Sequence, residues 1–123
     1  MTNEVMAMGP YFRAVIDSLD FFMQREDPSR VVAMLRMMQA HTQLYRGILF
    51  ITVSNDTITP AIKQEMAAIA DMVCDFKVRT IGSDFETSMI VSKFRNAPEN
   101  LSIMVYRVTP EEGITPETVE RIA

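Results

Sequence analysis

The 123-residue sequence has one cysteine, Cys74, four glycines and no tryptophan. A single cysteine excludes an internal disulfide and a zinc site built from several cysteines. No apolar run approaches the roughly 20 residues that a membrane-spanning helix needs. The first residues also lack the basic stretch and apolar core of a secretory signal. We therefore expect no membrane partner and a cytoplasmic location.

Positive charge is also sparse. The 12 Lys and Arg residues are outnumbered by 16 Asp and Glu residues, which gives a net charge of −4. Proteins that bind nucleic acid normally carry a basic stripe. We therefore expect that this chain alone binds no nucleic acid. Hydrophobic residues make up 48% of the sequence. Residues 1–123 are long enough to bury a real core and are expected to form a single domain.

Strand and helix patterns alternate in the first part of the chain. Residues 12–19 and 47–53 are short apolar runs, which predict strands buried on both faces. Helices are predicted at 28–45 and 60–70, because each of these segments begins with a capping residue followed by proline. His41, the only histidine, lies at the flank of the first helix, where a solvated or singly hydrogen-bonded side chain is expected.

The second part of the chain predicts strands of another kind. Residues 72–79 alternate apolar and polar side chains, which predicts a strand with one apolar face that includes Cys74. Residues 85–94 and 101–108 predict an antiparallel hairpin, and 115–122 predict a short terminal helix. The order strand, helix, strand, helix, strand predicts that the first three strands are parallel in an open α/β sheet.

Asp17 is an acid set into an apolar run. It either caps the next turn or lies at the carboxyl end of a parallel strand, where open α/β sheets bind ligands. Ser54 and Asn55 follow the second strand, so they are expected to approach Asp17 and Ser18. An acid with hydroxyl and amide neighbours suits a hydrated Mg²⁺ and a phosphate.

Lys93 and Arg95 are the other candidates for a site. Two residues apart in a strand, they are expected on the same face. They could clamp a phosphate, or they could be solvated charges that protect a sheet edge.

Together these segments resemble the second half of a RecA-type P-loop ATPase core, nearest to the KaiC-like branch. The resembling segments are 14–19 as the Walker B strand, 47–52 and 72–78 as the next core strands, 92–96 in the hairpin, and 106–115 at the end. The resemblance implies an α/β fold: part of a RecA-like three-layer fold with a mostly parallel sheet and a C-terminal antiparallel β-hairpin.

The resemblance also implies roles for particular residues. Asp17 resembles the Walker B aspartate, which acts on Mg²⁺ through water. Ser54 and Asn55 fall where such proteins sense the γ-phosphate of ATP. Lys93 and Arg95 match a Lys-x-Arg that, in the KaiC branch, reaches the nucleotide of the neighbouring subunit in a ring. ATP and Mg²⁺ are therefore the implied cofactors of a full-length protein.

The sequence departs from this family in one respect that matters. It contains no Gly-x-x-x-x-Gly-Lys-Ser/Thr loop, which supplies most of the phosphate binding in this class. The family's catalytic glutamate lies before the Walker B strand, in a part that is absent here. We therefore expect no ATP hydrolysis and no tight nucleotide binding by this chain alone.

The missing phosphate loop has a structural consequence, because in RecA-type sheets its strand lies between 47–53 and 72–78. An unpaired strand edge favours a homo-oligomer, with a two-fold dimer preferred, or pairing with the missing N-terminal half of the core. Direct pairing of the two strands within one chain is the competing outcome.

Three functions remain open at this point. The chain could be half of an ATP-binding core, or a degenerate stand-alone module that oligomerises or binds a regulatory partner without nucleotide. It could also be an enzyme of another class that uses Asp17 with Ser54 or Ser18. The third is weakest, because no histidine or second acid lies where a nucleophile would need a base.

Overall fold

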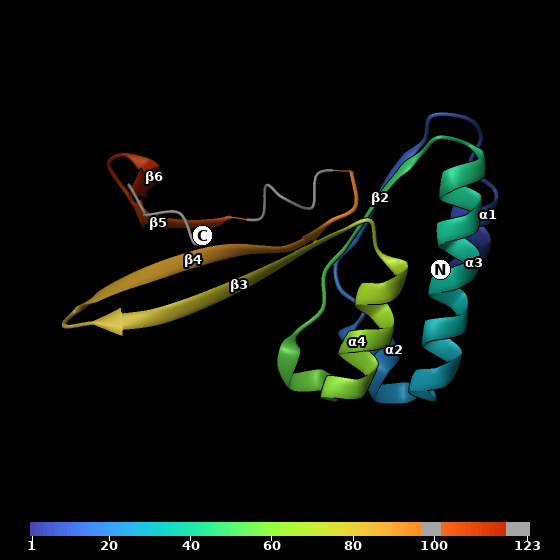
Figure 1. The fold of residues 1–123 in the computed structure, drawn as a ribbon, viewed down its shortest axis with the longest axis horizontal. Coiled ribbons are helices and arrows are strands. Elements are labelled where there is room, and N and C mark those ends of the chain that lie inside the picture. The colour runs from blue at the N-terminus through green and yellow to red at the C-terminus, as the bar shows by residue number, and fades with distance from the viewer. Residues whose placement is uncertain (97–101, 118–123) are drawn as a thin grey trace. The chain divides into compact units, whose positions relative to one another are not determined.

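The computed structural model describes residues 1–96 and 102–117 (Figure 1). The chain divides into two compact units, which are Met1–Ala70 and Asp71–Ala123 and are called here the N-terminal unit and the C-terminal unit. Compact units need not fold independently, so the single domain expected from the sequence stays a prediction.

The N-terminal unit alternates helices and strands. Its elements are α1 (Thr2–Met6), β1 (Arg13–Ile16), α2 (Asp20–Arg25), α3 (Pro28–Leu44), β2 (Ile48–Ile51), a short 3-10 helix η1 (Asn55–Thr57) and α4 (Pro60–Ile69). Strands β1 and β2 are parallel, with Arg13 opposite Ile48. The parallel pair and the two long helices confirm the sequence prediction for this part of the chain.

Local capping explains where the two long helices begin. The Asp27 carboxylate accepts a hydrogen bond from the backbone N–H of Ser29 at 3.0 Å, just before α3. The Thr59 hydroxyl accepts one from the N–H of Ile62 at 3.2 Å, before α4. Each helix has proline in its first turn, where its missing N–H costs nothing. Helix α2 was not predicted, because six residues are too few to show a helical pattern.

The core of the N-terminal unit lies under one face of the two-stranded sheet. Its buried members are Val5, Phe12, Leu19, Met23, Val31, Leu35 and Met38. Ala14 and Ile16 of β1 pack against this cluster, whereas Val15 is 68% exposed. In β2, Phe50 on the same outer face is 61% exposed. The prediction that both strands are buried on both faces is therefore wrong for the described residues.

His41 has a structural place in α3. It is buried, and its Nε2 lies 2.9 Å from the carbonyl oxygen of Met8. Because a carbonyl only accepts, Nε2 carries the proton in this hydrogen bond. The ring also packs against Phe12 and Tyr45, with centroid distances of 5.6 and 4.4 Å. Of the two expected alternatives, a solvated or a singly hydrogen-bonded side chain, the structure shows the second.

The C-terminal unit is an antiparallel sheet. Its strands are β3 (Met72–Ile81), β4 (Asp84–Phe94), β5 (Ile103–Thr109) and β6 (Gly113–Glu117), and they are hydrogen-bonded in that order. The predicted hairpin of the fourth and fifth strands is confirmed. Its connection at 97–101 lies outside the described residues.

Three predictions fail in this unit. Strand β3 pairs with β4 in an antiparallel sheet, so it is not the third strand of a parallel sheet, and the expected mostly parallel sheet is wrong. Direct pairing of residues 72–78 with 47–53 is also wrong, because β3 belongs to another sheet than β2. Residues Thr115 to Glu117 lie in β6 rather than in a helix. The remainder of that predicted helix, 118–122, lies outside the described residues.

Turn geometry explains why β3 turns back. Ile81 pairs with Asp84, so Gly82 and Ser83 form a two-residue loop. Gly82 has a φ of 62°, the positive value that tight hairpin turns need at their first position. This local contact between neighbouring segments costs little loop entropy compared with a distant parallel partner. In β6, Pro116 lies in a strand at the sheet edge, where a missing N–H is tolerated.

Candidate functional site

The parallel ladder brings the carboxyl ends of β1 and β2 together. Beyond the strands, the N–H of Thr52 donates to the carbonyl of Ile16 at 3.0 Å, and the N–H of Leu19 donates to the carbonyl of Thr52 at 2.9 Å. The Leu19 side chain is completely buried in the core. Leu19 thus anchors the segment that carries Asp17 and Ser18, and we call this region the carboxyl edge.

Asp17 directly follows β1 and is exposed. Its Oδ1 accepts a hydrogen bond from the hydroxyl of Thr52 at 2.7 Å, and Thr52 directly follows β2. Within the described residues this is the one hydrogen bond of the Asp17 side chain. The interpretation that places Asp17 at the carboxyl end of a parallel strand is confirmed in its geometry, and the carboxylate does not cap the next turn.

A second acid at the carboxyl edge was missed by the sequence analysis. Asp20, the first residue of α2, accepts hydrogen bonds on Oδ1 from the N–H of Ser54 at 2.8 Å and from the hydroxyl of Thr57 at 3.1 Å. The backbone N–H of Ser54 is the main cause that lowers the pKa of Asp20. An acid three residues after Asp17 was visible in the sequence, but its partner 34 residues away was not.

Ser54 and Asn55 reach the same edge. Ser54 lies between β2 and η1, Asn55 is the first residue of η1, and both are exposed. The hydrogen bond from the Ser54 N–H to Asp20 ties this loop to the segment that follows Asp17. The structure thus brings Ser54 to Asp20, whereas the predicted approach of 54–55 to 17–18 and the roles of these side chains stay predictions.

The carboxyl edge fits a hydrated metal better than it fits a phosphate. Within residues 1–96 and 102–117, no group of three His, Cys, Asp or Glu side chains could enclose a metal ion. Mg²⁺ keeps several waters and needs only one or two protein carboxylates, so an exposed Asp17 beside a hydroxyl suits it. A firm hold on phosphate needs a run of backbone N–H groups such as a glycine-rich loop, and the sequence has none.

Lys93 and Arg95 lie in the C-terminal unit. Lys93 is half-buried near the end of β4, opposite Val73. Arg95 follows the last residue of β4 and pairs through Nη1 with the carboxylate of Asp71 at 2.7 Å. The N–H of Arg95 also donates to the carbonyl of Asp71 at 2.9 Å. Arg95 thus closes the open end of the β3–β4 hairpin, and the phosphate contact of either residue stays a prediction.

Cys74 lies half-buried in β3. Desolvation, and then the neighbouring Asp75 carboxylate, raise the pKa of its thiol. A raised pKa lowers the fraction of reactive thiolate. This agrees with the interpretation of Cys74 as a small apolar side chain.

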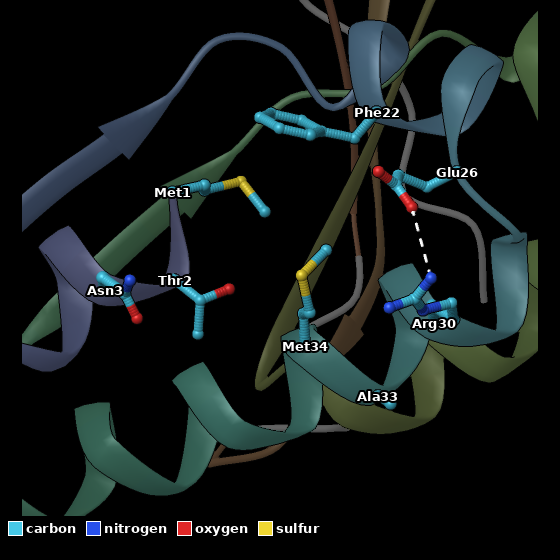
Figure 2. A pocket seen from close by; sticks show the side chains of 8 residues that line it. All are labelled: Met1, Thr2, Asn3, Phe22, Glu26, Arg30, Ala33 and Met34. Carbon is cyan, nitrogen blue, oxygen red and sulfur yellow. Dashed lines mark ion pairs between the residues drawn. The ribbon is translucent and has the colours of Figure 1, made fainter.

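A surface pocket of about 440 Å³ lies elsewhere in the N-terminal unit, among α1, α2 and α3 (Figure 2). It is lined by Met1, Thr2, Asn3, Phe22, Glu26, Arg30, Ala33 and Met34. Figure 2 shows Met1, Phe22 and Met34 around its interior, with the Glu26–Arg30 ion pair of 3.8 Å at one side. None of the residues predicted from the sequence to bind a ligand lines this pocket.

Among the described residues, no helix has both the length and the apolar character that crossing a bilayer would require.

The solved structures with a similar fold include FlaH and a KaiC-like protein. The flagellar accessory protein FlaH from Methanocaldococcus jannaschii matches 96% of this chain and 54% of its own, with a TM-score of 0.67 and 19% identity. The match to a KaiC-like protein from Pyrococcus horikoshii covers 86% of this chain and 46% of that protein, with a TM-score of 0.61 and 16% identity. The chain therefore spans about half the length of the solved structures that it resembles.

The chain itself belongs to DUF7125, a family of unknown function whose model matches residues 2–107. No curated protein matches the sequence. The resemblance to KaiC-like proteins is thus confirmed for the fold over most of the chain.

Proposed function

We propose that the chain is the Walker B-containing half of a RecA/KaiC-like ATP-binding core and has no ATPase activity of its own. The observation that carries the proposal is the carboxyl edge, where the exposed Asp17 carboxylate accepts a hydrogen bond from Thr52 and Asp20 accepts one from the backbone of Ser54. The similarity in fold to FlaH and the KaiC-like protein supports it.

Each residue of the edge takes a separate role in this proposal. Asp17 binds a water of Mg²⁺, with the Thr52 hydroxyl fixing the carboxylate. Ser54 and Asn55 face the γ-phosphate of ATP. Asp20 is a positioning residue, because it holds the Ser54 backbone.

Lys93 and Arg95 are proposed to meet phosphate only in an assembly with a neighbouring subunit. The ion pair of Arg95 with Asp71 would then be exchanged for phosphate. Such an exchange is cheap, because exposed ion pairs are worth roughly 0–1 kcal/mol.

The missing phosphate loop sets the expected strength of binding. One water-mediated carboxylate and a few hydroxyl or amide groups replace a whole cradle of N–H donors. We therefore expect Mg-ATP to bind this chain weakly, in the millimolar range, without hydrolysis.

Titration of the ¹⁵N-labelled chain with Mg-ATP, followed by NMR, tests the proposal. The expected result is a set of small amide shifts concentrated at 17–18 and 54–55, which saturate only at millimolar ligand. Asp17→Asn should abolish the Mg²⁺ dependence of these shifts. Asp56→Asn is the matched control, because it removes an exposed carboxylate beside Asn55 and should leave the shifts in place.

Two results would contradict the proposal. Amide shifts that avoid the carboxyl edge would mean that the edge is not the nucleotide site. Sub-micromolar affinity would mean that a phosphate site exists elsewhere in the chain.

A second candidate function is a stand-alone module that oligomerises or binds a regulatory partner without nucleotide. The observation that favours it is the amount of apolar surface on the sheet of the C-terminal unit, where Phe76 and Val78 of β3 are 57% and 66% exposed.

A further inference from the structure

The strand register divides the C-terminal sheet into two faces of different character. Cross-strand partners lie on the same face of a sheet. Phe76 pairs with Met89, which pairs with Met104. Val78 lies on the same face as Val108, and Val108 pairs with Ile114. No position on this face from Cys74 to Val91, or in β5 and β6, holds a charged residue.

The other face holds the charged residues of this sheet region, together with the half-buried Ile90, Ile103 and Val105. Arg79 pairs with Glu86 at 2.8 Å, and Arg107 pairs with Glu117 at 2.6 Å. Lys77 takes the same face by its register with Ser88. The polar face is thus suited to water, and the apolar face is the one that needs a cover.

The apolar face carries large side chains that are exposed. Six large side chains on it are 45% to 70% exposed. They are Phe76, Val78, Phe85, Met104, Val108 and Ile114. Scattered exposed apolar residues are normal, but a contiguous face of this kind marks an interaction site.

The exposed area is about three quarters of what one partner buries in a standard dimer interface. Aromatic side chains carry roughly 150–250 Å² each and the aliphatic ones somewhat less, so the six together expose on the order of 600 Å². This lies at the upper end of the largest apolar patches on monomers, roughly 300–600 Å², and near the roughly 800 Å² that each partner buries in a standard interface.

We propose that this apolar face binds the same face of a second copy of the chain, in a two-fold sandwich of two sheets. Two such sheets pack about 10 Å apart with interdigitated side chains. A face without charge brings no like charges together across the two-fold axis, although each chain carries a net charge of −4. The apolar face offers no charged group to a charged partner. This favours a second copy of the chain as the partner. The inference deepens the second candidate function and does not depend on nucleotide.

Sedimentation velocity at micromolar concentration tests the dimer. The expected species contains two 14.0 kDa chains. Val78→Asp should weaken dimerisation on the order of 100-fold, because it buries an unpaired charge twice in a two-fold interface. Lys77→Asp is the matched control, because it introduces the same side chain one residue away on the polar face. It should leave the dimer intact.

Isotope-filtered NOEs from mixed labelled and unlabelled wild-type chains locate the interface without any substitution. The expected signals join the methyl groups of Val78, Val108 and Ile114 between two copies. A monomer at micromolar concentration would overturn the proposal, as would equal effects of the two Asp variants. Intermolecular signals confined to the exposed edge of β2 would overturn it as well. None of these results bears on the Mg-ATP shifts at Asp17, so the two proposals fail separately.

Discussion

Leu19→Ala tests whether one buried side chain holds the carboxyl edge in place. Leu19 is 0% exposed and stands between Ser18 and Asp20 in the sequence. Its N–H bond to Thr52 survives the substitution, because only side-chain atoms are removed. The change therefore isolates packing from hydrogen bonding.

The magnitude follows from the burial. Removing the outer carbons of a fully buried leucine costs roughly 2–5 kcal/mol, the lost transfer energy plus the cavity left behind. We expect about 3 kcal/mol at Leu19. With a urea slope of roughly 1–3 kcal/mol per M for a small protein, the unfolding midpoint should fall by about 1–3 M.

Urea unfolding followed by helical circular dichroism is the assay. All described helices lie in the N-terminal unit, so this signal reports on the unit that contains Leu19. Leu44→Ala is the matched control, because Leu44 at the end of α3 is 76% exposed. It should change the free energy of unfolding by less than about 0.5 kcal/mol. If both variants shift the midpoint equally, Leu19 is not the anchor of the edge.

Two further predictions concern the stability of the N-terminal unit. Gly47→Ala should destabilise it by about 1–3 kcal/mol in urea unfolding, because the new Cβ would clash with the Phe12 ring. Gly9→Ala, whose Cβ would meet nothing within 4 Å, should be neutral in the same assay. The folded-state pKa of Asp20 is lowered, so its contribution to stability is complete above the ordinary aspartate pKa and is lost as the pH falls through the lowered one. Asp20→Asn should thus flatten the acid loss of stability measured by urea midpoints, and an unchanged acid profile would count against the Ser54–Asp20 bond.

The carboxyl edge shows which residues of a site can be predicted from sequence patterns and which cannot. Asp17, Ser54 and Asn55 could be assigned to one edge because short buried runs and capped helices indicate parallel strands, and parallel strands end together. Asp20 could not be assigned, because its partners Ser54 and Thr57 become neighbours only when the chain folds. A hydrogen bond between segments 34 residues apart leaves no periodic signal.

The sequence by itself determined the elements whose signals are local. Asp27 and Thr59 mark the starts of α3 and α4, and alternation over residues 72–79 marks a strand, because caps and side-chain periods act within a few residues. Only the tertiary structure decided how those elements pair. An alternating strand can pair in either direction, and the two-residue Gly82-Ser83 loop selected the antiparallel neighbour for β3. Thr59–Pro60 opens α4, but the same dipeptide at Thr115–Pro116 lies in a strand, because there β5 offers hydrogen-bond partners that no local pattern records.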